Sequence, residues 1–179
     1  MKDMIKTVTV LCVISLIAGA LLGLVNEITF ISDEEILNSK LKTAYAAEAF
    51  TPVQTASEEG LLGVYSPDGA DGVYVYYVTD EGYGGEIKLL VTVENNLLTK
   101  IVKVEAGETA GLGDNAFKDK FLSQFYGTDI STAETYPAFP DKTSGVDAVS
   151  GATITSNAML RMINLVIVSH KAILQGEAA

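Results

Sequence analysis

The stretch EIKLLVTVENNLLTKIVKVE, residues 86–105, indicates the kind of fold that this chain adopts. It contains two apolar runs of β-forming residues, Glu86 to Val93 and Leu98 to Glu105. Asn95 and Asn96 stand between the two runs, and such a pair between apolar segments is typical of a β-hairpin turn. The stretch therefore predicts two antiparallel strands joined by a short turn.

Neighbouring segments extend this prediction in both directions. Residues 61–65 and 73–79 are further β-like runs, separated by Asp-Gly and Gly-Gly pairs that predict turns. After the hairpin, apolar residues recur at helical spacing in 114–126 and in about 156–174, with a proline-containing irregular crossing between them. Strands, helix, loop and helix in this order predict an α+β domain around an antiparallel sheet.

The N-terminal part of the chain predicts a membrane anchor. Residues 7–25 carry no charge, and the run is about long enough to cross the core of a bilayer as a helix. Lys2 and Lys6 precede the run and acidic residues follow it, which favours a cytoplasmic N-terminus with the rest of the chain outside the cell membrane. A signal peptide is the alternative, but the run is long for one and no small-residue cleavage site closely follows it.

We therefore expect three parts. Residues 1–31 form a cytoplasmic start and a single-pass transmembrane anchor, 32–60 form a helical connector and linker, and 61–179 form an extracytoplasmic domain. Within the connector, the apolar positions of 33–47 predict a helix, and the polar stretch 51–60 predicts a linker.

The composition argues against several classes of function. The formal net charge is −11, and nucleic acid is not expected as a partner because phosphate binding needs a basic surface. The sole cysteine, Cys12, lies in the apolar run and is expected to be a packing residue, the alternative being a ligand shared with a partner chain. No His, Cys or carboxylate cluster has metal-ligand spacing, so no metal site and no catalytic residue is predicted. His170 falls late in the last helix and is expected to be a surface residue or one whose charge compensates the helix dipole.

The run DAVSGATITSN, residues 147–157, is the strongest candidate for a binding site. Gly151 lets the backbone bend and approach a ligand closely, and Ala152 adds no bulk beside Thr153. A helical pattern follows, Thr155 fits as its N-cap, and a helix N-terminus offers free N–H groups and positive potential to a phosphate. The alternative is a polar turn with a helix cap.

A second candidate is the segment ETAGLGD, residues 108–114. Two glycines flank Leu112, so the backbone could approach a planar ligand while one apolar side chain packs on its ring. The alternative is a tight turn that leads into a helix with Asp114 as its N-cap. The residues that would contact such a ligand are Glu108, Thr109, Gly111, Leu112 and Gly113.

These segments resemble those of proteins that carry FMN covalently on a threonine, such as the G subunit of the Rnf electron-transport complex. Residues 147–153 are similar to the signature Asp-x-x-(Ser/Thr)-Gly-Ala-Thr of that family. Residues 108–114 resemble its Glu-Thr-Pro-Gly-Leu-Gly-Asp segment, with Ala110 in place of the usual proline. Residues 82–87 resemble its Tyr-Gly-Gly-x-Ile start of a strand.

The resemblance implies that the hydroxyl of Thr153 carries FMN through a phosphodiester bond. A separate flavin transferase would be required, because nothing in the chain activates this hydroxyl. The chain would then be an electron-carrier subunit of an Rnf-type ion-translocating ferredoxin:NAD⁺ oxidoreductase complex, with other membrane subunits and the lipid bilayer as partners. It would be a redox subunit of a translocase, not a complete enzyme. The other residues that the motif places at the flavin are Asp147, Ser150, Gly151, Ala152 and Thr155.

Two alternatives share these motifs. The C subunit of a Nqr-type Na⁺-translocating NADH:quinone reductase has the threonine motif, but the Tyr-Gly-Gly segment, Asp114 and the short chain favour Rnf. A membrane-anchored FMN-binding sensor or assembly module without turnover is the other alternative. Reduction of the bound flavin by the intact complex on a catalytic timescale would exclude it.

Overall fold

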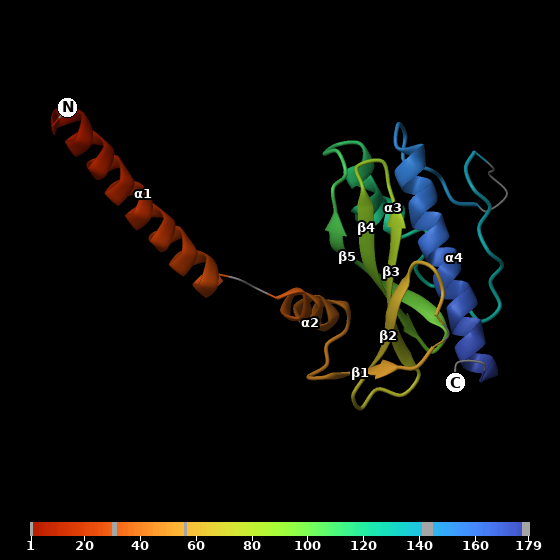
Figure 1. The fold of residues 1–179 in the computed structure, drawn as a ribbon. Helices are drawn as coiled ribbons and strands as arrows, with labels where there is room; N and C mark the ends of the chain where they lie inside the picture. The colour runs from red at the N-terminus through yellow and green to blue at the C-terminus, as the bar shows by residue number, and fades with distance from the viewer. Residues whose placement is uncertain (1, 30–31, 56, 141–144, 177–179) are drawn as a thin grey trace. The chain divides into compact units, whose positions relative to one another are not determined.

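The computed structural model describes residues 2–29, 32–55, 57–140 and 145–176 (Figure 1). The chain divides into two units, Met1–Ile36 and Leu37–Ala179. The elements in chain order are α1 (Lys2–Thr29), α2 (Asp33–Ala44), β1 (Phe50–Val53), β2 (Leu61–Pro67), β3 (Val73–Glu81), β4 (Glu86–Glu94), β5 (Leu97–Ala106), the 3₁₀ helix η1 (Gly113–Phe117), α3 (Asp119–Leu122) and α4 (Thr153–Gln175).

Helix α1 makes up most of the first unit and is apolar between its charged ends. Its segment Met4–Asn26 has 23 residues and a mean hydropathy of 2.7, with none of the most apolar window buried. At about 1.5 Å per residue such a helix is roughly 35 Å long, enough for a hydrocarbon core of about 30 Å. By length and composition, α1 fits a single-pass membrane anchor, as the sequence predicts.

The second unit is built on a five-stranded antiparallel sheet in the order β1-β2-β3-β4-β5 (Figure 1). Side chains on successive residues point to opposite faces of a strand. Leu89 and Val91 therefore belong to the main core with α4, while Val75 and Leu90 pack on the other face against Leu41 of α2. The antiparallel α+β fold predicted from the sequence is confirmed.

The hairpin between β4 and β5 also forms as predicted. Glu94 pairs with Leu97 across the turn. Asn95 and Asn96 have φ of 50° and 68°, in the left-handed region that asparagine tolerates better than most residues. The runs predicted at 61–65 and 73–79 correspond to β2 and β3.

Three expectations of local structure were wrong. Residues 114–126 do not form one helix, because the extended Lys118 (φ −95°, ψ 151°) separates η1 from α3. The N-cap position of η1 is Leu112, so Asp114 is not the cap. The stretch 51–60 is not entirely a linker, because Phe50–Val53 pairs with β2 as the edge strand β1. Pro52 obscures this strand in the sequence, since proline lacks an N–H and is tolerated in edge strands.

The prediction that His170 lies at the surface was also wrong. His170 has 0% exposure, because α4 packs on the sheet to its last turns. Its Nδ1 lies 2.7 Å from the Tyr76 hydroxyl and its Nε2 lies 3.0 Å from Asn96 Oδ1. This pattern fits a neutral ring that accepts from Tyr76 and donates to Asn96. Burial lowers the pKa of His170, and the Asp129 carboxylate offsets part of this effect.

Candidate functional site

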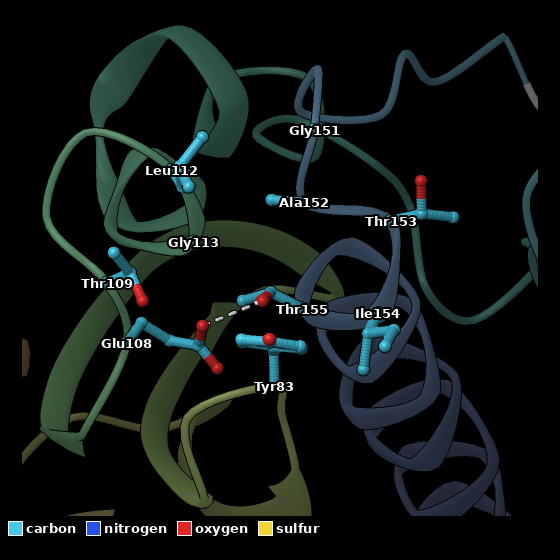
Figure 2. Close-up of a pocket in the computed structure, with 10 residues that line it drawn as sticks. All are labelled: Tyr83, Glu108, Thr109, Leu112, Gly113, Gly151, Ala152, Thr153, Ile154 and Thr155. Atoms are coloured by element: carbon cyan, nitrogen blue, oxygen red, sulfur yellow. Dashed lines mark hydrogen bonds between the residues drawn. The ribbon is translucent and has the colours of Figure 1, made fainter.

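A pocket of about 420 Å³ opens where three segments meet at the start of α4 (Figure 2). The segments are the turn between β3 and β4, the loop that follows β5, and the residues at the N-terminus of α4. Its volume lies within the usual range for small-molecule sites of about 300–1,000 Å³. The lining residues are Tyr83, Glu108, Thr109, Leu112, Gly113, Gly151, Ala152, Thr153, Ile154 and Thr155.

The structure thus brings together the two segments that the sequence singled out. Residues 108–113 and 151–155 are separated by more than one element in the chain, yet they form adjacent walls of one pocket. The third wall is the turn that contains Tyr83, and this turn belongs to the segment 82–87 that resembles the same family of proteins.

The two threonines at the start of α4 differ in accessibility. Thr153 is the first residue of α4 and its side chain is exposed. Thr155 has 0% exposure, and its hydroxyl donates a 2.9 Å hydrogen bond to Glu108 Oε2. Figure 2 shows Thr153 apart from the Glu108–Thr155 pair. A second protein can therefore reach the hydroxyl of Thr153 but not that of Thr155.

Thr155 is not the helix cap that its sequence position indicates. The N-cap of α4 is Ala152, and no side chain caps the helix there. Thr155 instead lies inside the first turn, where its hydroxyl is engaged by Glu108. The first turn of an α-helix leaves N–H groups without intrahelical acceptors, so this end of α4 suits a phosphate.

The carboxylate of Glu108 is closely surrounded by glycines. Its Oε1 accepts a 3.1 Å hydrogen bond from the N–H of Gly84, and its Oε2 accepts the bond from Thr155. A Cβ atom at Gly82 or Gly113 would collide with the Glu108 carboxylate. The sequence indicated that Gly113 leaves room for a ligand, but its tight contact is with the protein itself.

Leu112 and Gly111 have different places in the loop. Leu112 is 49% exposed at the pocket, and a Cβ added at Gly151 would lie 3.5 Å from its Cδ2 atom. Gly111 is not among the lining residues; its φ of +79° and the 2.6 Å bond from Asn115 Nδ2 to its carbonyl shape the turn. Leu112 is therefore the apolar side chain that the loop presents to the pocket. Gly111 contributes the backbone turn that precedes it.

Asp147 and Ser150 precede the pocket without lining it. Both are exposed. The backbone N–H of Asp147 donates to Gln124 Oε1 at 2.7 Å, and its carbonyl accepts from Gln124 Nε2 at 3.2 Å. These bonds fix the chain ahead of α4, and any contact of the two side chains with a cofactor stays a prediction.

Tyr83 and Ile154 were not predicted as site residues. Tyr83 is 72% exposed at the pocket and Ile154 is 53% exposed beside it. Tyr74, Tyr76 and Tyr77 lie on strand β3, but Tyr83 lies in the turn after that strand. A tyrosine in a glycine-rich turn has no neighbouring strand to bury it. This position in the sequence was the signal that could have identified Tyr83 as an exposed residue of the site. Exposed apolar side chains gathered at a pocket are typical of a ligand site.

Comparisons with known proteins agree with this geometry. The FMN-binding domain family matches residues 82–168, which include all three walls of the pocket. The chain is 40% identical over 91 residues to the G subunit of the proton-translocating ferredoxin:NAD(+) oxidoreductase complex of Clostridium ljungdahlii, an alignment that covers 49% of this chain and 48% of that protein. It therefore matches only about half the length of that relative.

Two other relatives align over most of their length. The G subunit of the ion-translocating oxidoreductase complex of Methanosarcina acetivorans is 30% identical over 174 residues, which cover 89% of this chain and 90% of that protein. The G subunit of the Na(+)-translocating ferredoxin:NAD(+) oxidoreductase complex of Acetobacterium woodii is 27% identical over 191 aligned positions, covering 93% and 91%. The chain belongs to the family of FMN-binding G subunits of ion-translocating oxidoreductase complexes.

Proposed function

We propose that this chain is the electron-carrier subunit of an Rnf-type ion-translocating ferredoxin:NAD⁺ oxidoreductase complex, and that it carries FMN in a phosphodiester bond to Thr153. Family membership supports the complex, and the pocket at the start of α4 supports the place of the cofactor. The observation that carries the attachment is the contrast between an exposed Thr153 and a fully buried Thr155.

The residues of the pocket suit FMN in three ways. The N-terminus of α4 supplies N–H groups and positive potential for the phosphate, next to the hydroxyl of Thr153. Leu112 and Ile154 offer apolar area to the ring, and Tyr83 offers an aromatic face. When bound, the flavin would supply the redox chemistry, and these residues would orient the ring and exclude water from part of it.

Attachment requires a partner protein. A threonine hydroxyl needs a general base or a metal to become a nucleophile. Among the described residues that line the pocket, the one carboxylate is that of Glu108, and it is bonded to Gly84 and Thr155 rather than to Thr153. A flavin transferase therefore acts on the exposed Thr153, and the remaining partners are the membrane subunits of the complex and the bilayer around α1.

Mass spectrometry of the denatured protein tests the attachment. Co-expression with a flavin transferase should yield FMN mass on the peptide that contains Thr153. Thr153→Ala should remove this mass while the far-ultraviolet circular dichroism stays that of the parent, because the side chain is exposed. Thr153→Ser, which keeps a hydroxyl, is the matched control. An adduct mapped to Thr155, or FMN retained in Thr153→Ala, would contradict the proposal.

The orientation in the membrane follows from the flanks of α1. We propose a cytoplasmic N-terminus, with residues 61–179 outside, because Lys2 and Lys6 precede the span. Protease added to sealed right-side-out vesicles should digest the flavin domain. Complete protection of the domain, or a mature N-terminus downstream of α1, would overturn this topology.

A further inference from the structure

Glu108 is placed where the three walls of the pocket meet. Its own loop follows β5, its Oε1 is bonded to the turn between β3 and β4, and its Oε2 is bonded to the first turn of α4. One carboxylate thus connects segments that lie 24 and 47 positions away from it in the sequence. Figure 2 shows it between Thr109, Thr155 and Tyr83.

The packing around Glu108 leaves little freedom for this arrangement. A Cβ at Gly84 would collide with the carbonyl of Gly107, so the turn lies directly against the backbone that carries Glu108. A Cβ at Gly113 would meet both the Glu108 carboxylate and, at 3.0 Å, the hydroxyl of Thr155. The glycines allow three backbone segments to close around one acidic side chain.

The sequence leaves two roles open for Glu108, which are a hydrogen bond to the polar edge of the flavin or bonds that satisfy the turn around it. In the structure, each of its two oxygens already accepts a hydrogen bond from a different wall. Hydrogen bonds to a charged acceptor are stronger than those between neutral groups, and exchanging them for a contact to the ligand would release the walls from one another.

We propose that Glu108 is a positioning residue, which holds the Tyr83 turn against the first turn of α4 and so fixes the orientation of the flavin ring. This inference rests on the proposed function and deepens it. Tyr83 owes its place over the pocket to Gly84, its neighbour in the chain, and Gly84 is held by the carboxylate. The same carboxylate holds Thr155, two residues after the proposed attachment point.

The decisive variant is Thr155→Val, which keeps the shape of the side chain and removes the bond to Glu108 without changing Glu108. If Glu108 couples the two walls, this substitution should change the exchange at Gly84, which is bonded to Glu108 and not to Thr155. Full-length protein in detergent, prepared without the flavin transferase, is compared by amide hydrogen exchange. We expect exchange in the 82–85 turn to be about tenfold faster in both variants. Thr155→Val removes one of the two bonds to the Glu108 carboxylate, and Glu108→Gln replaces the charged acceptor of the Gly84 N–H by a neutral amide oxygen.

The flavin itself provides the second measurement. In protein loaded with FMN, visible circular dichroism of the flavin reports a fixed orientation of the ring. Thr155→Val and Glu108→Gln should each weaken this signal, and the double variant should weaken it no further than the stronger single variant. Thr155→Ser should rescue both measurements, since it restores the hydroxyl.

Ser169→Ala is the matched control for a general effect on α4. It removes a hydroxyl–carboxylate bond from the same helix, the 3.2 Å bond of Ser169 to Glu58, away from the pocket. It should leave both the 82–85 exchange and the flavin signal as in the parent. An equal change in Ser169→Ala would mean loosening of the whole helix and would overturn the proposal.

Three other results would also overturn it. One is a Thr155→Val protein with parental exchange at 82–85 and a parental flavin signal. Another is a Glu108→Gln effect on the flavin that adds to that of Thr155→Val, which would mark Glu108 as a direct ligand. The third is failure of Thr155→Ser to rescue. If Glu108→Gln does not fold, Thr155→Val still decides the matter. Protein that carries no FMN at all would defeat the proposed function, while the exchange measurement would still decide whether Glu108 couples the walls.

Discussion

Replacement of His170 by phenylalanine should destabilise the domain by about 1.5–4.5 kcal/mol. Phenylalanine preserves the edge contacts of the ring with Tyr74 and Tyr76, so little cavity forms. The hydroxyl of Tyr76 would lose its acceptor at a site of 0% exposure, which costs about 1–3 kcal/mol. Asn96 would lose the other bond, but it is only partly buried and can bind water, so we add about 0.5–1.5 kcal/mol.

The double variant Tyr76→Phe, His170→Phe gives this estimate a sharper test. It removes the unpaired hydroxyl together with its former partner. The double variant should therefore be more stable than His170→Phe alone, by about 1–2 kcal/mol, although it carries one more substitution. Urea unfolding of the full chain in detergent, followed by circular dichroism, measures the free energy of unfolding of the parent and the two variants. The comparison uses the same dependence on urea concentration (m value) for all three proteins.

The reasoning fails if the two substitutions are additive, so that the double variant is the least stable of the three. That result would mean that the 2.7 Å contact between Tyr76 and His170 contributes no coupling energy. A His170→Phe protein as stable as the parent would likewise show that the buried hydroxyl of Tyr76 loses its partner at no cost.

Three further predictions concern stability and local order. Burial lowers the pKa of His170 from 6.5, so its contribution to the free energy of unfolding should be complete above about pH 6.5. The contribution should fall as the pH drops below that value, by at most about 1.4 kcal/mol per pH unit. His170→Phe should abolish this pH dependence when urea unfolding is measured at a series of pH values. Gly84→Ala should cost more than about 1 kcal/mol in urea unfolding, because its Cβ would collide with the carbonyl of Gly107 and the turn would have to move. Arg161→Met should cost less than about 1 kcal/mol, because its fork on Asp80, with bonds of 2.6 and 3.1 Å, joins an exposed side chain to a partly exposed one.

Local signals in the sequence predicted the sheet well and the region after it poorly. The strands follow from apolar runs of β-forming residues and from the turn pair Asn95 and Asn96, signals that act over a few positions. The spacing of the aromatic residues in 114–126 is compatible with one helix and also with two short helices separated at Lys118. Periodicity alone cannot distinguish the two structures. The burial of His170 depends on the path of α4 across the sheet, a property of the tertiary structure.

The candidate site divides in the same way. Short motifs located the residues around Thr153 and Leu112, because each motif lies within a few positions of the chain. The role of Glu108 could not be read from its motif, since its partners Gly84 and Thr155 are distant in sequence and become neighbours only on folding. Tyr83 does not stand out in the sequence because tyrosines are frequent in β3, although its place in a turn distinguishes it from them.

The position of Thr153 at the first residue of a 23-residue helix has a consequence for modification of the chain. Ordering a loose acceptor segment in a modifying enzyme would cost roughly 1–2 kcal/mol of conformational entropy per backbone residue. At Thr153, the proposed acceptor, the backbone is already ordered by the folding of the domain, while the side chain is exposed to solvent. If a transferase attaches FMN there as proposed, we expect folded protein to be its substrate and unfolded chain to be modified poorly, so that attachment would also act as a check that the domain has folded.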